Sequence, residues 1–178
     1  MKKPIFNKDR LINSNLRVNH AGEYGAKLIY SGQVDFSKTS NEKELFNHMR
    51  EQEIIHLKYF ENELPARRIR PSALLPAWHI GGYLMGAVSS LLGIKYSMIC
   101  TEAVEEVIDN HYQNQIDIFS KFNDEKNLLN SIKSFKDDEV EHKEIAEKYT
   151  KNLNLPQKLS YQIISNICKV AIAITKKI

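Results

Sequence analysis

Two short segments of this chain carry residues that bind metal ions in helical proteins. They are Glu53-Ile-Ile-His56 and Glu139-Val-Glu-His142, each a Glu-x-x-His. A glutamate and a histidine three positions apart share one face of an α-helix, so each segment presents a carboxylate and an imidazole together. A single Glu-x-x-His is equally typical of a polar helix surface. The interpretation as a site therefore depends on the elements that position the two segments.

Helical periodicity extends over most of the chain, which has only seven glycines and five prolines in 178 residues. The apolar spacing predicts helices over about 9–36, from about 42 to the residue before Pro65, over 94–119, over 128–149 and after Pro156. Thr39 and Glu42 resemble a capping box. Asn123 or Asp124 is the expected N-cap of the helix over 128–149. We therefore expect an all-α fold.

Each Glu-x-x-His helix follows a helix with one glutamate on its apolar stripe, Glu23 in the first case and Glu105 in the second. In an antiparallel hairpin, residues equidistant from the turn face each other. The midpoint of Glu23 and Glu53 is residue 38, and the midpoint of Glu105 and Glu139 is residue 122. Both midpoints fall in predicted polar turns. The glutamates are thus predicted to lie at matched heights in two hairpins.

Four carboxylates in a dry core need compensation, because burying an unpaired charge is costly. Two divalent cations would balance them, and oxygen and imidazole ligands without thiolate fit iron or manganese rather than structural zinc. This donor set is that of ferritin-like di-iron and di-manganese bundles. We expect Glu53 and Glu139 to bridge two metals about 3.5–4 Å apart. The predicted ligands are Glu23, Glu53, His56, Glu105, Glu139 and His142.

Four segments resemble the demethoxyubiquinone hydroxylase family of ubiquinone biosynthesis. They are residues 17–26, 53–60, 100–107 and 138–142, and the likeness extends from about residue 17 to residue 148. The resemblance implies a ferritin-like di-iron monooxygenase with the six ligands above. It also implies the reaction, in which O₂ hydroxylates the ring of a 2-polyprenyl-3-methyl-6-methoxy-1,4-benzoquinol (demethoxyubiquinol).

The chain has no G-x-G-x-x-G loop and no flavin motif, so its reducing equivalents must come from outside. NADH and the quinol itself are the expected donors. His111 and Tyr112 match a family pair that lies near the irons and is implicated in their reduction. In the alternative interpretation, Tyr112 packs in the core and His111 lies on the surface.

Three other side chains carry weaker signals. Asp138 lies four residues before His142 and is expected to orient that ring. His20 is expected to pack near the site without binding metal, and His48 to lie on the surface.

Residues 71–94 contain no Asp, Glu, Lys or Arg. The segment is long enough to span a bilayer, but its prolines and glycines disfavour a solitary spanning helix. We expect an additional apolar helix over about 72–93 in the membrane interface, with residues 71–95 on the membrane surface and Arg67, Arg68, Arg70 and Lys95 near headgroups. A protein or dimer interface and a true span are the alternatives. A last amphipathic helix ends the chain.

The net charge of +3 is too small to indicate nucleic-acid binding. Cys100 and Cys168 are expected to be buried thiols in a reducing compartment. Residues 1–10 lack the apolar core of a signal peptide. We therefore expect one domain over 1–178, peripheral to the cytoplasmic face of a bacterial cell membrane, with a polyprenyl quinol, O₂ and pathway proteins or a second copy as partners. The rival functions are a ferritin-like ferroxidase or other di-metal carboxylate protein, and a non-enzymatic membrane-docking module.

Overall fold

The computed structural model describes residues 8–178, so most of the N-terminal stretch considered for a signal peptide lies outside it. It contains six helices: α1 (Lys8–Asp35), α2 (Ser40–Ala66), α3 (Leu75–Leu91), α4 (Ile94–Phe119), α5 (Lys126–Thr150) and α6 (Leu155–Thr175). No strand occurs between residues 8 and 178. The predicted all-α class is confirmed.

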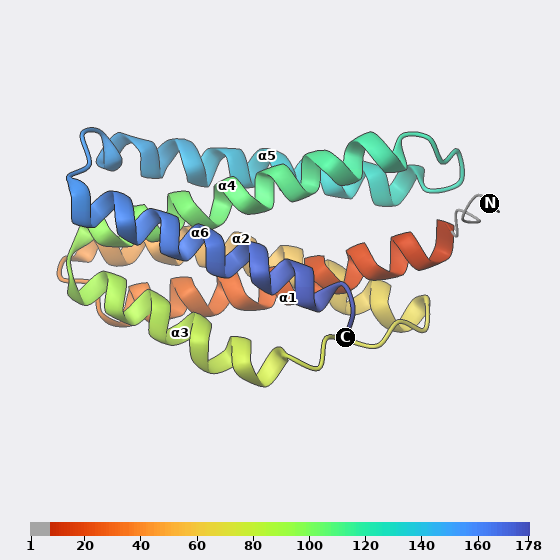
Figure 1. Cartoon of the computed structure of the whole chain (residues 1–178), viewed down its shortest axis with the longest axis horizontal. Helices are drawn as coiled ribbons and strands as arrows, with labels where there is room; N and C mark the ends of the chain where they lie inside the picture. Colours follow the sequence, from red (N-terminus) through yellow and green to blue (C-terminus); the bar gives the residue numbers. More distant parts are fainter. Residues whose placement is uncertain (1–7) are drawn as a thin grey trace.

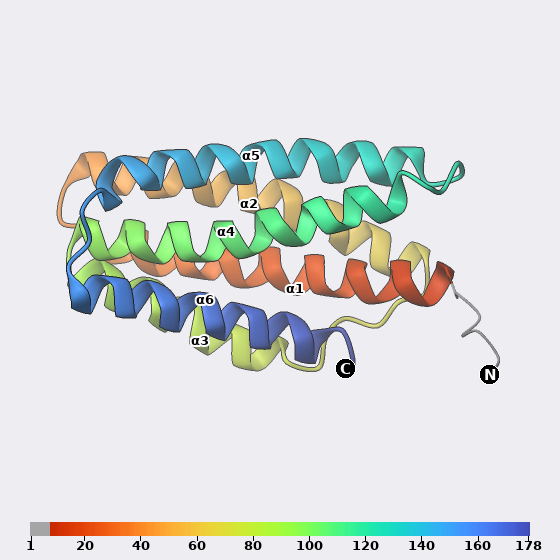
Figure 2. The ribbon, with the colours of Figure 1, turned by 45° about the horizontal axis from the view of Figure 1, so that its top comes forward.

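The helices stack in three layers, with α2 and α5 in one, α1 and α4 in the next, and α3 and α6 in the last (Figure 2). Helix α1 packs against both α2 and α3, and α4 packs against both α5 and α6. Helices α1, α2, α4 and α5, which make up the first two layers, form a ferritin-like four-helix bundle. The two additional helices that were predicted, α3 and α6, are present and cover the outer side of α1 and α4 (Figure 1).

Two apolar clusters lie at opposite ends of the four-helix bundle. One contains Leu16, Phe60, Tyr112 and Ile132. The other contains Tyr30, Met49, Met98 and Ala146. On each of the four helices, the predicted ligands fall between a residue of the first cluster and a residue of the second. The polar site is therefore enclosed at both ends by apolar side chains.

Two helix boundaries differ from the sequence prediction. Helix α2 continues through Pro65 to Ala66. The proline is tolerated because it removes only one backbone bond in the last turn, which Arg67 then closes by donating its N–H to the Glu63 carbonyl. Helix α5 begins at Lys126 without a side-chain cap. The cap position is Glu125, one residue after Asp124, so neither Asn123 nor Asp124 caps the helix as predicted.

Glycines allow α3 to lie directly on α1. A Cβ at Gly86 would fall 1.9 Å from the Ile29 carbonyl oxygen, and a Cβ at Gly32 would fall 2.3 Å from the Tyr83 carbonyl oxygen. Only glycine permits this approach of the two backbones. Helix α3 therefore buries its small residues against α1 and leaves its large apolar residues exposed: Ile80, Leu84, Val88 and Leu91.

Candidate metal centre

The six predicted ligands meet in the middle of the bundle. Glu23 comes from α1, Glu105 from α4, and the two Glu-x-x-His pairs from α2 and α5. None of the six residues is more than 2% exposed. The hairpin geometry expected from the turn positions is thus present in the structure.

The six side chains form two groups that share two members. Glu23 and His56 complete one group and Glu105 and His142 complete the other, while Glu53 and Glu139 belong to both. Within each group, one ligand atom from every residue lies within 4.8 Å of the others. The sharing of Glu53 and Glu139 is the arrangement that two bridging carboxylates require.

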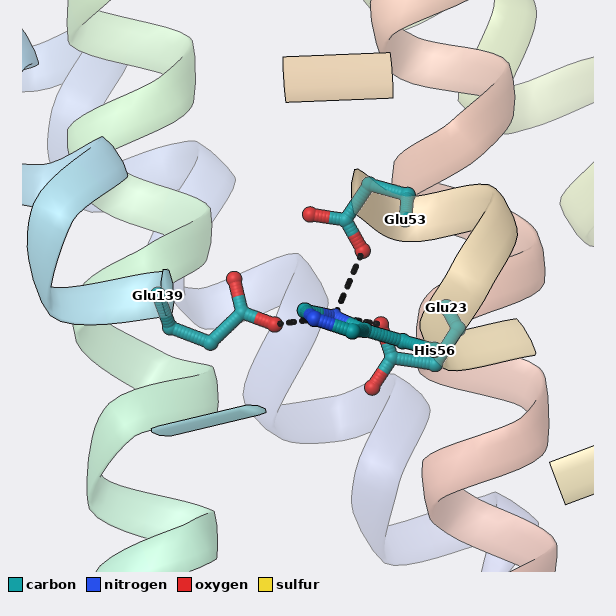
Figure 3. A group of neighbouring side chains, drawn as sticks. All are labelled: Glu23, Glu53, His56 and Glu139. Carbon is teal, nitrogen blue, oxygen red and sulfur yellow. Dashed lines mark ion pairs between the residues drawn. The ribbon is translucent and has the colours of Figure 1, made fainter. Parts of the chain in front are cut away.

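The first group surrounds the Nδ1 atom of His56 (Figure 3). This nitrogen lies 3.3 Å from Glu139 Oε1, 3.6 Å from Glu23 Oε2 and 3.9 Å from Glu53 Oε2. In the second group, the Nδ1 atom of His142 lies 3.4 Å from Glu53 Oε1 and 3.4 Å from Glu139 Oε2. Each shared carboxylate therefore offers one oxygen to each histidine.

The atoms that face the centre of the site have no hydrogen-bond partners. These atoms are both side-chain oxygens of Glu53 and of Glu139, Oε2 of Glu105, and Nδ1 of His56 and of His142. Buried polar atoms without partners are rare in folded proteins, and each one demands an explanation. Two divalent cations would satisfy all of them, so the residues fit a two-metal centre.

Electrostatics inside the cluster point the same way. Burial, and then repulsion from Glu139, raise the pKa of Glu53 and of Glu105 well above the usual range. Burial alone would lower the pKa of His56, but Glu139 and Glu23 raise it to about 12. Burial alone would raise the pKa of Glu139, but His142 and His56 lower it to about 2. Without metal, the protein therefore holds protons on Glu53, Glu105 and His56 and leaves Glu139 ionised, and a bound cation would displace those protons.

The outward ring nitrogens of the two histidines find different partners. His56 donates its Nε2–H to Asp138 Oδ2 at 2.9 Å. His142 donates its Nε2–H to Gln52 Oε1 at 2.8 Å. The prediction that Asp138 orients His142 is wrong. Both residues belong to α5, but Asp138 projects across to α2, where His56 lies.

Two buried tyrosines hold Glu23 and Glu105, the terminal carboxylates, each of which belongs to only one of the two groups. Tyr112 of α4 donates its hydroxyl hydrogen to Glu23 of α1, and Tyr30 of α1 donates to Glu105 of α4. Burial raises the pKa of both phenols well above the usual range, so both remain neutral donors. Tyr30 was given no role by the sequence analysis. Its signal is the spacing, since each tyrosine follows a terminal glutamate of its own helix by seven residues.

His111 lies at the inner wall of a groove between α4 and α6. It is 7% exposed, so the alternative of a surface histidine is wrong. Its Nε2–H donates to Asn19 Oδ1 at 3.1 Å, and burial lowers its pKa to about 3. The groove has a volume of about 460 Å³ and is also lined by Tyr161, Lys169 and Lys176.

The remaining predictions divide. His48 is exposed, as predicted. His20 is buried outside both groups of ligands, in line with the expected packing position. Cys100 is buried, whereas Cys168 is only partly buried because it borders a cavity.

That cavity lies between α1, α3, α4 and α6 and has a volume of about 340 Å³. Its walls are almost entirely apolar, with Trp78 and Met85 from α3 and Ile167 from α6. Gly22 and Val104, the chain neighbours of Glu23 and Glu105, also line it. The cavity therefore approaches the terminal carboxylates from the side covered by the additional helices.

Residues 10–175 match the family described as "Ubiquinone biosynthesis protein COQ7". The chain is 40% identical over 171 residues to the mouse "NADPH-dependent 3-demethoxyubiquinone 3-hydroxylase, mitochondrial", covering 95% of this chain and 77% of that protein. It is 43% identical over 137 residues to the "3-demethoxyubiquinol 3-hydroxylase" of Rhodospirillum rubrum, covering 76% and 64%. It is 38% identical over 172 residues to the "5-demethoxyubiquinone hydroxylase, mitochondrial" of Saccharomyces cerevisiae, covering 88% and 74%. This chain belongs to the COQ7 family of ubiquinone biosynthesis proteins.

Proposed function

We propose that this chain is a di-iron monooxygenase that hydroxylates the ring of a demethoxyubiquinol with O₂. The observation that carries the proposal is the pair of buried ligand groups that share Glu53 and Glu139. Membership of a family whose relatives are named as demethoxyubiquinol hydroxylases supports the substrate class. The reaction consumes O₂, two electrons and two protons, places one oxygen atom on the ring and releases the other as water.

Within this proposal, the six ligands hold two iron ions, which supply the electrons for O₂ activation. Glu53 and Glu139, which belong to both ligand groups, would be shared by the two ions, and Glu23 and Glu105 would each hold one. Tyr112 and Tyr30 orient these two terminal carboxylates through their hydroxyl groups. The apolar clusters at the two ends of the bundle exclude water from the centre.

We propose that the apolar cavity receives the quinol. Its volume of about 340 Å³ is in the range of small-molecule sites, and its wall suits a substituted ring and the start of a prenyl chain. Gly22 and Val104 of the wall are the chain neighbours of Glu23 and Glu105, so a ring in the cavity would lie on the side of the site that these two ligands occupy.

We propose that α3 and α6 bring this cavity to a membrane surface. The two helices form the outer layer of the molecule (Figure 2) and expose large apolar residues in rows, including Leu84 and Val88 on α3. Among the helices of residues 8–178, none combines the length and hydropathy needed to cross a bilayer. Arg67 does not contribute to headgroup contact, because Glu63 and Glu125 already pair with it. In a bacterium this surface is the cytoplasmic face of the cell membrane.

Vesicle flotation tests the membrane proposal. We expect the protein to float with liposomes that contain anionic lipid, and replacing Leu84 and Val88 by serine to lower the floated fraction severalfold. Ile55→Ser is the control, since Ile55 is 64% exposed but belongs to α2 in the opposite layer. Equal flotation of the control and the α3 variant contradicts this orientation, and no flotation at all favours an interface with a protein or a second copy.

We propose that reducing equivalents enter through the groove beside His111. Lys169 and Lys176 make no ion pair in the described chain, so they are available to the phosphates of a nicotinamide dinucleotide. His111 lines the groove, and the centroid of its ring lies 6.4 Å from that of Tyr112. Tyr112 in turn donates a hydrogen bond to Glu23, which connects the groove to the site. The names of several relatives specify NADPH dependence, which favours an external nicotinamide donor over the quinol alone.

Anaerobic reconstitution with iron, followed by product analysis with demethoxyubiquinol and O₂, tests the central proposal. We expect two irons per chain and a hydroxylated product. Glu139→Ala is expected to abolish hydroxylation and lower iron occupancy, while Glu141→Ala, an exposed neighbour on α5, retains both. Full iron loading with ferrous oxidation but no hydroxylated quinol favours the ferroxidase alternative. Absence of iron binding favours a docking module.

A further inference from the structure

The two metal positions are nearly equivalent in their direct ligands. Position 1 is formed by Glu23 and His56 and position 2 by Glu105 and His142, and both share the two bridging carboxylates. Each terminal glutamate accepts a hydrogen bond from one neutral, buried tyrosine. The direct ligands and the tyrosines therefore contribute about equally to the metal affinity of the two positions.

The two side chains that accept the outward N–H of the histidines differ in charge. Asp138 accepts the Nε2–H of His56 at 2.9 Å, whereas Gln52 accepts that of His142 at 2.8 Å. The geometry is the same in both cases, because each histidine turns its unpartnered Nδ1 toward the cluster and its Nε2 outward. The chemical difference is that Asp138 carries a negative charge and Gln52 is neutral.

A carboxylate acceptor makes an imidazole a stronger ligand. It stabilises positive charge that moves onto the ring when Nδ1 donates to a cation, and its own charge attracts that cation. Asp138 is about one-third exposed, at 35%, so water weakens the long-range part of this effect. The direct hydrogen bond remains, and in the described chain His56 is the one ion-pair partner of Asp138. Its charge is therefore not neutralised by a lysine or an arginine.

We infer that the two metal positions are unequal, and that Asp138 and Gln52 make them so. Position 1 binds a divalent cation more tightly and fills first. Position 2 fills second and loses its ion more readily. The inference rests on the proposed two-metal centre, and it assigns to Asp138 and Gln52 a positioning role that acts through the two histidines.

Titration of the metal-free protein with Mn²⁺ under anaerobic conditions tests the inference. Calorimetry and electron paramagnetic resonance measure the binding of each equivalent. We expect two binding steps whose dissociation constants differ by at least about 10-fold. The first equivalent gives the six-line signal of an isolated Mn²⁺ ion, and the second converts it to the broadened signal of a coupled pair.

Two variants are expected to reduce the difference in metal affinity between the two positions. Asp138→Asn keeps the shape of the side chain and removes its charge, so it is expected to weaken the first step by about 10- to 100-fold and leave the second unchanged. Gln52→Glu adds a charge behind His142, so it is expected to strengthen the second step and narrow the gap from the other side. Asp137→Asn is the control, because it removes one charge at an exposed neighbouring residue of α5.

Each outcome has one meaning. Two equal dissociation constants in the unmodified protein overturn the inference. It is also overturned if Asp138→Asn and Gln52→Glu leave the ratio of the two constants unchanged, or if Asp137→Asn reduces that ratio by the same factor. If Asp138→Asn prevents folding, Gln52→Glu alone decides, since it must narrow the gap. Failure of the unmodified protein to bind any Mn²⁺ contradicts the two-metal centre itself and not the inequality of its positions.

Discussion

The contact between α1 and α3 yields the most quantitative prediction, through Gly86→Ala. The added Cβ would lie 1.9 Å from the Ile29 carbonyl oxygen and 2.7 Å from the Ile29 carbonyl carbon. Both are backbone atoms, so no side-chain rotation relieves the clash. Because ordinary contact begins near 3.4 Å, α3 must retreat from α1 by roughly 1.5 Å.

The magnitude follows from two opposing effects. Overpacking of this kind costs about 1–3 kcal/mol, and the rigid backbone contact favours the upper end. Replacing glycine by alanine in a helix returns about 1 kcal/mol. A net loss of about 1–2 kcal/mol lowers the Tm of a chain of this size by roughly 2–8 °C.

Gly81→Ala is the matched control on the same helix. Its Cβ would meet nothing within 4 Å, so only the helix-propensity gain remains. We expect this variant to melt about 2–4 °C above the unmodified protein. Thermal unfolding followed by circular dichroism at 222 nm measures both. A Gly86→Ala protein that melts as high as Gly81→Ala refutes the close packing of α3 on α1.

Three further predictions concern protons and the reductant. Lowering the pH from 7 to 5 should weaken Mn²⁺ binding, because Glu53 and Glu105 have raised pKa values and take up protons that compete with the cation; calorimetry in buffers of different ionisation enthalpy would show proton release on binding. Burial holds the pKa of His111 at about 3, so the folded state binds fewer protons than the unfolded state below about pH 6.5, and stability falls as the pH drops. His111→Gln should remove up to about 1.4 kcal/mol per pH unit of that slope, measured by urea unfolding between pH 6.5 and 4; an unchanged slope contradicts the burial argument. Replacing Lys169 and Lys176 by glutamine should raise the KM for NADPH by roughly 3- to 10-fold with little change in kcat, and an unchanged KM removes the groove as the nicotinamide site.

Sequence periodicity predicted which side chains meet at the candidate metal centre because it records two independent constraints. Glu23 and Glu53 had to lie on core-facing stripes, and their midpoint had to fall in a turn. Within one hairpin these two conditions determine which residues face each other. The three predicted ligands of each hairpin could therefore be placed together from the sequence, and the need to compensate four buried carboxylates then joined the two sets.

The groups behind the ligands could not be predicted in this way. The partner of Asp138 depends on how α5 is rotated against α2, and periodicity within one helix contains no information on that rotation. Spacing along α5 favoured His142, whereas the structure pairs Asp138 with His56. The predicted cap of α5 was also wrong, because the helix begins at Lys126 with Glu125 at the cap position and no side-chain cap.

The two halves of the chain are alike in pattern and differ where the chemistry needs a direction. Each half supplies a glutamate helix with a tyrosine seven residues later, a Glu-x-x-His helix, and an outer helix packed on the first. If the halves were identical, the site would present the same face to the proposed quinol and to the proposed reductant, and its two proposed metal positions would be equivalent. The differences that exist separate these roles: the cavity wall of α3 is apolar, the groove along α6 carries two lysines, and the histidines are supported by Asp138 on one side and Gln52 on the other.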